Sequence, residues 1–432
     1  MSLENVSIVP LKDVVKRVKV GFVGSCNNDY CSSDEGVPMI RTTNLTTEGI
    51  KLENLKYINN TFHIAHKKSQ LHFGDILIAR HGHNGLASLW EYKFDAQCLN
   101  VVVVEPDESL ANRYYLTYLI NSPLIQKQIK SLTGGSVQSV VNTKDIADLL
   151  IPIPSLDKQK GIADFISLFN KKISVCKSIN KNLEEQIETI YNSFFVYYDD
   201  FLKEDLEECE IGLIPKEWSL LSLGDVTTKI NEKVGSNDYK VFSAVNTGNL
   251  ILSEEYFDKQ VYSKSIEKYI VVKQKEFAYN PARINIGSIG RNDFGFDGCV
   301  SPVYVAFKVE EGYENFMNMY IKSNRFNQWV ITLSSGSVRQ TLNYNDFSII
   351  KIAYPPKELI NKFNTIYDSY CEVINYNKSV INNLEKIRDL LLPKLMSGEI
   401  DVSKINCDLE LKYNYMKYLF NQIHKQLSKS VV

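Results

Sequence analysis

Histidine binds metals and moves protons near neutral pH, and in this chain it is concentrated in one short segment. Five of the six histidines lie between His63 and His83. The pair His81 and His83 could project from one face of a strand and hold a metal ion. No cysteine or carboxylate pattern accompanies the pair, and the matching segment of the second half of the chain has no histidine. We therefore expect no metal site and interpret these histidines as polar loop residues that contact a partner.

Two other segments have parts of enzyme motifs, but each lacks a group that the chemistry needs. Tyr279-Asn280-Pro281-Ala282 is similar to the Asn-Pro-Pro-Tyr loop of amino methyltransferases, but no aromatic residue follows to stack on a flipped base. Segment 294–298 is rich in glycine, yet no helix pattern follows it, so it is a poor phosphate or adenosyl site. The sequence has no G-x-x-x-x-G-K-[ST] loop and no G-x-S-x-G elbow. We expect no catalytic residues in this chain.

The composition is that of an ordinary globular protein. With 432 residues, of which 44% are hydrophobic and 23% charged, the chain is long enough for two or more domains. The N-terminus lacks the features of a signal peptide, and no apolar run approaches the roughly 18 residues of a membrane span. The eight cysteines form no C-x-x-C pair. These features predict a reduced, cytoplasmic protein without a membrane segment.

The net charge of −2 argues mildly against a free-standing nucleic-acid binder, which usually has an excess of basic residues. This net charge is compatible with local basic loops, or with a partner that supplies the phosphate contacts.

Two long amphipathic runs are expected to form helices that position the globular segments of the chain. In the first, from Leu156 to Phe195, apolar residues recur every three or four positions, and a second such run extends from Glu358 to Leu395. Because an apolar stripe of about 40 residues cannot remain exposed, we expect the two helices to pair in antiparallel fashion over about 60 Å. The two runs match, since four apolar residues of the second lie 201 positions after four of the first: Phe363 after Ile162, Tyr370 after Phe169, Leu384 after Leu183, and Leu395 after Phe194.

One polar residue falls on the predicted seam. Asn377 occupies the position that matches Cys176 in the first helix. A lone polar residue at such a seam can fix the register of a helix pair. A frayed or solvent-facing position explains it equally well.

The match extends to the segments that precede the helices. Segments 134–154 and 335–355 share glycine, serine, valine, asparagine, aspartate and proline residues at the same shift of 201 positions. The apolar run 74–85 corresponds in the same way to 275–290, and each is followed by a strand-like and then a helix-like segment. The chain is therefore a duplicated module, each copy consisting of a globular domain followed by a long helix.

We predict an α+β protein in which two similar mixed α/β domains have a pseudo-two-fold arrangement and are joined by two long antiparallel helices that form a coiled-coil spacer. The second helix is expected to stop at Pro393 and the Ser397-Gly398 pair. The predicted boundaries are a first domain at 1–155, a first helix at 156–198, an acidic connector at 199–215, a second domain at 216–356, a second helix at 357–397, and a tail at 398–432 that has the pattern of a short helix.

With this organisation in place, the sequence resembles the DNA-specificity subunit of type I restriction–modification systems. The resemblance covers residues from about 8 to 403. Its residues are GGSVQSVVNTKDIADLLIPIPSLDKQKGIADFI, AYPPKELINKF and NNLEKIRDLLLPKLMSGEIDV, and the stretches GDILIAR, VPMIRTTNL and FAYNPARINIGSIG are similar to target-recognition domains of that family.

The resemblance implies a non-catalytic subunit that binds double-stranded DNA. Each domain would read one half of a bipartite, asymmetric target, and the helices would hold the halves apart and dock two methyltransferase subunits. Restriction/translocase subunits would join the complex. S-adenosylmethionine, ATP and Mg are expected on these partner subunits, and no cofactor is expected in this chain. Helices of about 60 Å place the half-site centres at most about 18 base pairs apart.

The expected readers of DNA bases are polar residues at the ends of the matched strands, because Arg recognises guanine and Asn or Gln recognises adenine. Asn84 and Asn285 recur at matching positions, which favours a turn role, whereas unmatched pairs are better candidates for reading sequence. The predicted DNA-binding residues are Arg41, Thr42, Thr43, Asn44, Arg80, His81, His83, Asn84 and Gln138 in the first domain, and Asn246, Arg283, Asn285, Arg291, Asn292, Arg339 and Gln340 in the second. Partner contacts are expected on the polar face of the first helix, at Lys171, Lys172, Lys177, Lys181 and Glu185.

Two other functions compete with this interpretation. A stand-alone DNA methyltransferase or nuclease would need a nucleotide or adenosyl site in this chain. A coiled-coil scaffold that binds only protein would show no sequence preference in a DNA footprint of the assembled complex. Methyl transfer by the isolated chain identifies the first alternative, and an unselective footprint identifies the second.

Overall fold

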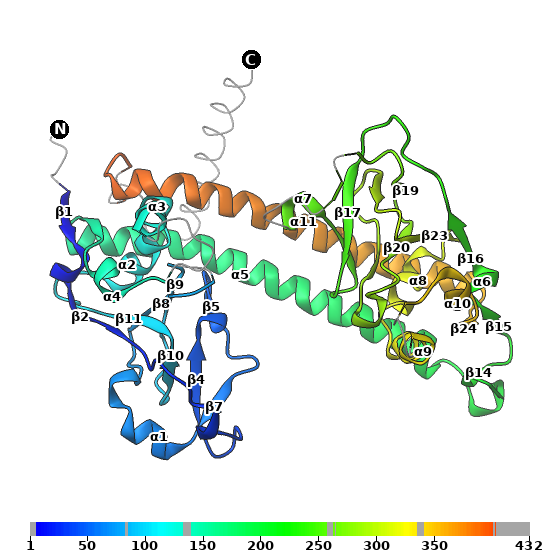
Figure 1. Ribbon diagram of the computed structural model, residues 1–432, viewed down its shortest axis with the longest axis horizontal. Coiled ribbons are helices and arrows are strands. Elements are labelled where there is room, and N and C mark those ends of the chain that lie inside the picture. Colours follow the sequence, from blue (N-terminus) through cyan, green and yellow to red (C-terminus); the bar gives the residue numbers. More distant parts are fainter. Residues whose placement is uncertain are drawn as a thin grey trace. The chain divides into compact units, whose positions relative to one another are not determined.

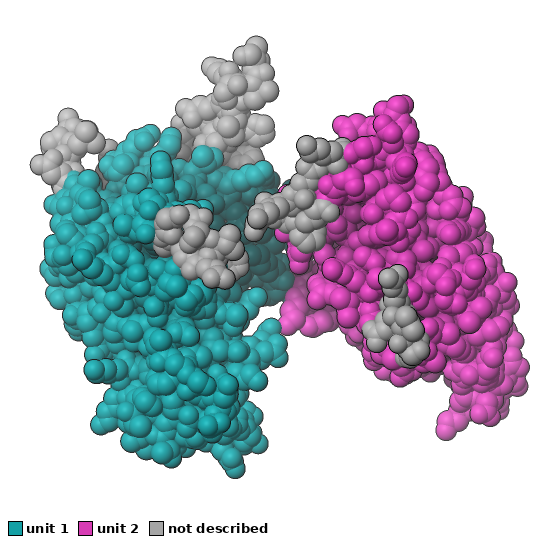
Figure 2. Space-filling view, in the orientation of Figure 1, with its two compact units in different colours: residues 1–178, 377–432 teal, residues 179–376 magenta. Residues whose placement is uncertain are grey.

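The computed structural model describes residues 6–82, 85–132, 140–256, 262–263, 265–334, 341–400 and 402. The chain divides into two compact units (Figure 2). Unit 1 comprises residues 1–178 and 377–432, and unit 2 comprises residues 179–376. Each unit therefore contains part of both long helices, α5 (Leu156–Asn192) and α11 (Lys357–Met396). Predicted residues 83, 84, 138, 339 and 340, and the predicted tail helix, lie outside the described residues.

Unit 1 is built on two four-stranded sheets (Figure 1). One has the order β2 (Val15–Val20), β11 (Val101–Pro106), β8 (Ile76–Ala79), β9 (Ala87–Leu89), and the other β10 (Gln97–Leu99), β4 (Val37–Arg41), β7 (Lys56–Ile58), β3 (Tyr30–Cys31). Two strand pairs accompany them, β1 (Ser7–Pro10) with β12 (Leu150–Ile153) and β5 (Leu45–Thr46) with β6 (Gly49–Ile50). The short helices are α1 (Asn60–Ala65), α2 (Arg113–Ile120), α3 (Pro123–Leu132) and α4 (Thr143–Ala147).

Unit 2 repeats this plan. One sheet has the order β16 (Thr227–Ile230), β23 (Val305–Val309), β20 (Phe277–Tyr279), β21 (Ile289–Arg291). The other has the order β18 (Asn249–Leu252), β17 (Lys240–Val245), β22 (Gly298–Val300), β19 (Ile270–Val272). Its strand pairs are β15 (Ser219–Ser222) with β24 (Lys351–Tyr354) and β13 (Leu206–Cys209) with β14 (Gly212–Pro215). Its short helices are α6 (Leu223–Val226), α7 (Ser253–Tyr256), α8 (Glu314–Tyr320), α9 (Asn324–Ser334) and α10 (Tyr344–Ser348).

The order β16-β23-β20-β21 reproduces β2-β11-β8-β9, and in both sheets all the strand pairs are antiparallel. Each unit also has one parallel pair, β4 with β10 and β17 with β22. The duplication read from the sequence is thus a duplication of topology.

The central strand of each unit is buried on both faces. In β8, Ile76 and Ile78 join one apolar cluster, while Leu77 and Ala79 join another. In β20, Phe277 and Tyr279 likewise belong to one cluster and Ala278 to a second. Because both faces are covered, these strands are continuous apolar runs rather than alternating ones.

In unit 1 the two long helices pack against each other in antiparallel fashion. Phe165 and Phe169 of α5 lie in the same buried cluster as Leu391 and Leu395 of α11. Further along, Cys176 shares a cluster with Ile381. As residue numbers rise along α5 they fall along α11, which is the predicted antiparallel direction.

Unit 2 has the corresponding packing. Tyr191 and Ile187 of α5 lie with Phe363, Tyr367 and Ile374 of α11 in the core of that unit. The α5 helix then passes into a π-helical turn at Ser193–Tyr197 and ends at Tyr198, which has a left-handed backbone with φ of 57°.

Three details differ from the predicted helices. Ile179, an apolar residue within the first predicted amphipathic run, is 41% exposed, and Asn180 is buried beside it, with its Nδ2 donating to the Ile374 carbonyl oxygen at 3.3 Å. The stripe advances four residues from Cys176 instead of three, because a helical turn has 3.6 residues. Asn377 is 8% exposed, so the solvent-facing interpretation of this position is wrong. Pro393 lies within α11, and the helix ends only before Gly398, whose φ is 76°.

The predicted acidic connector contains the β13–β14 hairpin, and Ile214 of this hairpin packs into the core of unit 2 with Trp218. No helix among the described residues is long and apolar enough to cross a membrane.

Phe363 tests the contribution of helix packing to unit 2. Its side chain is 1% exposed and its ring centroid lies 5.2 Å from that of Phe195. We expect Phe363→Ala to lower the free energy of unfolding of this unit by about 3 to 5 kcal/mol, because the cavity is fully enclosed. Urea unfolding followed by tryptophan fluorescence measures the change. The control is Tyr376→Ala on the same helix, at a side chain that is 69% exposed, where a change within about 0.5 kcal/mol is expected. Equal effects of the two substitutions would contradict the described packing.

Candidate nucleic-acid interface

Two loops from different sheets of unit 2 meet at one hollow. The first follows β17 and contains Asn246, and the second follows β20 and contains Asn285. Both residues were predicted from the sequence, and both line a hollow of about 330 Å³. Arg283 lies in the second loop and is exposed. The structure thus brings together three of the predicted DNA-binding residues of this unit.

Local bonds fix the shape of the second loop. The Asn280 side-chain oxygen accepts a hydrogen bond from the Ala282 amide at 3.1 Å, an arrangement that asparagine commonly makes in turns. The Ser288 hydroxyl donates to the Ala244 carbonyl oxygen at 2.6 Å, which ties the loop to β17. Gly287 has φ of 86°, and a Cβ atom there would lie 2.8 Å from the Asn246 carbonyl oxygen. The close approach of the two loops therefore depends on glycine at this position.

The same hollow is lined by polar residues that the sequence did not single out, namely Lys322, Ser323, Asn324 and Asn327. Lys322 and Ser323 lie in the turn between α8 and α9, and Asn324 and Asn327 lie in the first turns of α9. The Lys322 ammonium group donates to the Asn249 side-chain oxygen at 3.3 Å and adds a positive charge at the rim. The internal repeat could have indicated two of these residues from the sequence, since Lys322 and Asn327 lie 201 positions after Asn121 and Gln126.

Those two residues hold the corresponding loop of unit 1. Asn121 forms two hydrogen bonds with the backbone of Ala87, at 2.9 and 2.8 Å, and the Gln126 amide donates to the Gly85 carbonyl oxygen at 2.8 Å. Helices α2 and α3 therefore fix the base of the β8–β9 loop, which contains the predicted residues Arg80 and His81. His81 is exposed.

Arg80 joins two segments that were both predicted to reach DNA. Its Nε donates to the Val141 carbonyl oxygen at 3.1 Å, and the Val141 amide donates back to the Arg80 carbonyl oxygen at 3.2 Å. In unit 2 the Leu342 amide donates to the Pro281 carbonyl oxygen at 3.0 Å, but proline provides no side-chain bond. The guanidinium of Arg80 thus braces the loop base as well as carrying charge.

The predicted group begins at Arg41, the last residue of β4, and continues to Asn44, on the other sheet of unit 1. Asn44 is 4% exposed, and its side-chain oxygen accepts from the Arg41 amide at 3.0 Å while its amide donates to the Lys51 carbonyl oxygen at 3.3 Å. The Thr42 hydroxyl donates to the Asn100 carbonyl oxygen at 3.3 Å, whereas Thr43 is exposed. Asn44 therefore holds the turn, and we leave it out of the proposed reading surface.

Arg291 and Asn292 also lie inside the fold. The Arg291 guanidinium bonds to Asp293 at 2.6 Å, to the Asn315 oxygen at 2.7 Å and to the Tyr367 hydroxyl at 3.4 Å. Burial alone lowers the pKa of Arg291, but the Asp293 carboxylate and the Tyr367 hydroxyl outweigh burial, so the net shift is upward and the charge is retained. The Asn292 amide donates to two backbone carbonyl oxygens. We leave both residues out of the reading surface.

The predicted partner face on α5 is exposed, as expected for a contact surface. Some of its lysines form ion pairs with carboxylates of the same chain. The Lys177 ammonium group is paired with Glu48 and lies 3.7 Å from Glu385, and Lys181 lies 3.9 Å from Glu185. Lys171 and Lys172 are exposed on the same helix.

Two of these histidines, His63 and His66, take part in packing and hydrogen bonding within unit 1. The His66 ring packs against Phe62 and Phe22, with centroids 4.1 and 4.8 Å apart, and the His63 ring lies 3.3 Å from the Gln70 amide nitrogen. Within the described part of the chain, no group of three or more His, Cys, Asp or Glu side chains is arranged to hold a metal ion.

Fold and site together define a class of protein: two copies of one sheet-and-helix module, each with polar loops at the ends of equivalent strands. A family model, the type I restriction modification DNA specificity domain, matches residues 4–188.

Known relatives match over most of their length. A Methanocaldococcus jannaschii protein described as the MjaX type I restriction enzyme specificity subunit is 24% identical, covering 92% of this chain and 94% of that protein. The MjaIX specificity subunit of the same organism is 25% identical, over 67% of this chain and 70% of that protein.

A crystal structure of the type I restriction–modification S subunit from M. genitalium superimposes with a TM-score of 0.52, at 14% identity, covering 91% of this chain and 96% of that one. This likeness confirms the predicted fold class. Together these findings confirm the resemblance drawn from the sequence. Residues 4–188 match the type I restriction modification DNA specificity domain, and the relatives that match most of the chain are described as specificity subunits of type I restriction enzymes.

Gly287 tests the loop geometry of unit 2. We expect Gly287→Ala to lower the free energy of unfolding by about 1 to 3 kcal/mol, because the new methyl group meets a backbone carbonyl in a left-handed conformation. Gly235→Ala is the matched control, since that glycine has φ of 60° and a Cβ atom added there would meet nothing within 4 Å. Thermal unfolding measures both variants. A smaller loss for Gly287→Ala than for Gly235→Ala would show that the two loops do not touch.

Proposed function

We propose that each unit reads one half of a bipartite, asymmetric DNA target, and that the chain directs partner adenine methyltransferase and restriction subunits to that target. The observation that carries the proposal is a shared strand order with different loop residues. Arg80 and Pro281 occupy equivalent positions at the ends of β8 and β20. Two modules with one framework and unlike polar loops are suited to reading unlike sequences.

The chemistry of the loops fits direct reading of base edges. Arg283 provides the planar donor pair that recognises guanine, and Asn246 and Asn285 provide the amide groups that recognise adenine. Asn246 and Asn285 line one hollow and Arg283 lies in the same loop as Asn285, so one half-site can engage the three together. In unit 1 the corresponding contribution comes from Arg80, His81, Arg41, Thr42 and Thr43.

The partners in this proposal are double-stranded DNA, two methyltransferase subunits and restriction/translocase subunits. S-adenosylmethionine, ATP and Mg belong to those partners. Because this chain has a net charge of −2, the partner subunits supply a large share of the phosphate contacts that DNA binding needs. The exposed lysines of α5 are the proposed place of contact with the methyltransferases.

Sequencing of methylated bases in the host genome tests the proposal directly. Deleting this chain is expected to remove methylation from one bipartite adenine motif, and restoring it is expected to bring the methylation back. An unchanged pattern of methylation in a host that expresses all subunits would refute the proposal. Methyl transfer by the isolated chain would instead support the stand-alone enzyme.

Arg283 tests the division of labour between the units. In the assembled complex, Arg283→Ala is expected to weaken binding to the intact target about 10- to 100-fold, which corresponds to the loss of about 1 to 3 kcal/mol for one base contact. The variant is expected to lose discrimination only in the half-site read by unit 2, as measured by competition with DNA scrambled in one half or the other. Lys203→Ala, which removes the same charge from another exposed site of unit 2, is the control. Loss of discrimination in both half-sites would contradict the assignment.

A further inference from the structure

One large apolar side chain is exposed in the loop between β20 and β21 of unit 2. Ile286 is 57% exposed, whereas Ile284, two residues earlier, is buried in the core of the unit. A single exposed isoleucine is common on protein surfaces, so exposure alone indicates no function. The setting of Ile286 distinguishes it, because the same loop contains the polar side chains Arg283 and Asn285.

The backbone holds Ile286 in this position from both sides. Residues Ile284–Ile286 form a single 3-10 turn, in which the Ile286 amide donates to the Arg283 carbonyl oxygen at 3.1 Å and the Gly287 amide donates to the Ile284 carbonyl oxygen at 2.9 Å. The buried Ile284 side chain anchors the start of the turn, and the close approach of Gly287 to Asn246 fixes its end. The turn therefore presents the Ile286 side chain to solvent while Ile284 packs inside.

Ile286 also lines the hollow of about 330 Å³, together with Asn246 and Asn285. One apolar side chain thus shares this surface with two side-chain amides. In the major groove, adenine presents the N6 donor and N7 acceptor that an amide recognises, and thymine presents its C5 methyl, an apolar group. Amide and apolar groups on one surface are therefore the combination that suits an A·T pair.

The internal repeat shows that this position differs between the two units. Gly85 and Gly287 both have φ of 86° and lie two residues before the next strand, β9 or β21. These glycines are 202 positions apart, so the loop of unit 2 is one residue longer. The residue immediately before the glycine is Asn84 in unit 1 and Ile286 in unit 2. An amide in one unit and an apolar group in the other is what residues that read different bases require.

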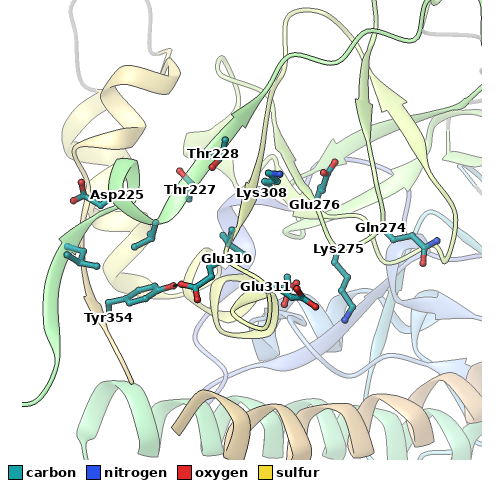
Figure 3. Close-up of a pocket in the computed structure, with 14 residues that line it drawn as sticks. Asp225, Thr227, Thr228, Gln274, Lys275, Glu276, Lys308, Glu310, Glu311 and Tyr354 are labelled. Atoms are coloured by element: carbon teal, nitrogen blue, oxygen red, sulfur yellow. Dashed lines mark hydrogen bonds between the residues drawn. The ribbon is translucent and has the colours of Figure 1, made fainter. Parts of the chain in front are cut away.

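The charges at the two ends of β20 indicate which end DNA can approach. A larger hollow, of about 600 Å³, lies at the end opposite the loop of Ile286 (Figure 3). Its lining includes two lysines, Lys275 and Lys308, and five acidic residues, namely Asp225, Glu276, Glu310, Glu311 and Glu314. This excess of carboxylates disfavours the phosphates of DNA. The described residues that line the hollow of Ile286 include Lys322 and no acidic residue, so the loop of Ile286 lies at the end that favours DNA.

We propose that Ile286 is a specificity-determining residue of unit 2 and that its side chain contacts the C5 methyl group of a thymine in the major groove. This role rests on the proposed reading function and adds a base feature that unit 2 recognises. The contact removes apolar surface of both groups from water, which favours binding. Cytosine lacks this methyl group, so the contact also distinguishes thymine from cytosine at that position.

Two substitutions and a control isolate the contribution of this side chain. Ile286→Ala removes the apolar group, and Ile286→Asn gives unit 2 the residue of unit 1. Ile349→Ala is the matched control, because Ile349 is also an exposed isoleucine of unit 2, at 54%, and lies outside the hollow at the end of α10. Thermal unfolding establishes that each variant is folded.

The probes are duplexes that contain the target found by methylation sequencing, with each thymine replaced in turn by uracil, which pairs with adenine but lacks the methyl group. Competition binding to the complex assembled with its methyltransferase subunits measures the affinity for each duplex. The unmodified complex and the Ile349→Ala complex are expected to prefer thymine to uracil about 3- to 10-fold at one position, in the half-site whose discrimination Arg283→Ala removes. With Ile286→Ala and Ile286→Asn, the preference at that position is expected to fall to about 1.

Three results would overturn the role of Ile286: equal binding of the thymine and uracil duplexes by the unmodified complex at every position, a thymine preference that Ile286→Ala retains in full, or a loss of preference confined to the other half-site. Failure of the reading function itself gives a different result. A complex that binds the target no better than a duplex scrambled in both half-sites contradicts the reading function. A complex that prefers the target but ignores the methyl group contradicts only the contact with Ile286.

Discussion

The burial of one narrow apolar stripe on each long helix is the constraint on which the rest of the structure depends. Neither α5 nor α11 can remain exposed along its apolar face, and in each unit the two helices cover each other. The strands and short helices of a unit then pack onto this pair. In unit 1 the side chains that connect the helices to the sheet include Phe165 and Phe169, and in unit 2 they include Phe363 and Tyr191. A module that builds its core on a helix shared with the other copy is well suited to duplication.

The two units share a sheet framework but differ in the loops at their surfaces. The sheets that contain β8 and β20 have the same strand order in the two units, and both strands are buried on both faces. The second sheet of each unit has a parallel pair, which lies at the edge of the sheet in unit 1 and at its centre in unit 2. The loops that follow β8 and β20 carry no such constraint, and they differ in length and in residue type. This combination is what a protein needs when two halves must present the same framework to DNA but read different bases.

Divergence also changed the interior of the two copies. In unit 2, Arg291 forms a buried network with Asp293, Asn315 and Tyr367, and so ties β21 to both α8 and α11. The equivalent position on β9, opposite Ile76 in the sheet, holds Leu89 in unit 1. Removing one member of such a network would leave a buried charge or donor without a partner, which costs far more than the net contribution of the network. The two units therefore have the same topology but different chemistry at the junction of sheet and helix.

The sequence by itself determined the features that repeat. The 201-residue shift, the amphipathic period of the two helices and the continuous apolar strands each follow from local spacing, and they were enough to predict the α+β class and the duplicated module. Asn246, Arg283 and Asn285 were also selected as candidates in this way, because turn residues after an apolar run mark strand ends. The family came from the resemblance of particular sequence stretches and not from this spacing.

Only the tertiary structure decided which polar residues face solvent. Asn44, Arg291 and Asn292 have the same residue types and the same position after a strand as the exposed candidates, yet their donors and acceptors are engaged inside the fold. Lys322 and Asn327 became candidates only because α8 and α9 bring them to the loop of Asn285. Local spacing specifies which face of an element is apolar. Whether a polar side chain at its end meets water or a buried partner depends on residues that are distant in sequence, and that is the information only the folded chain contains.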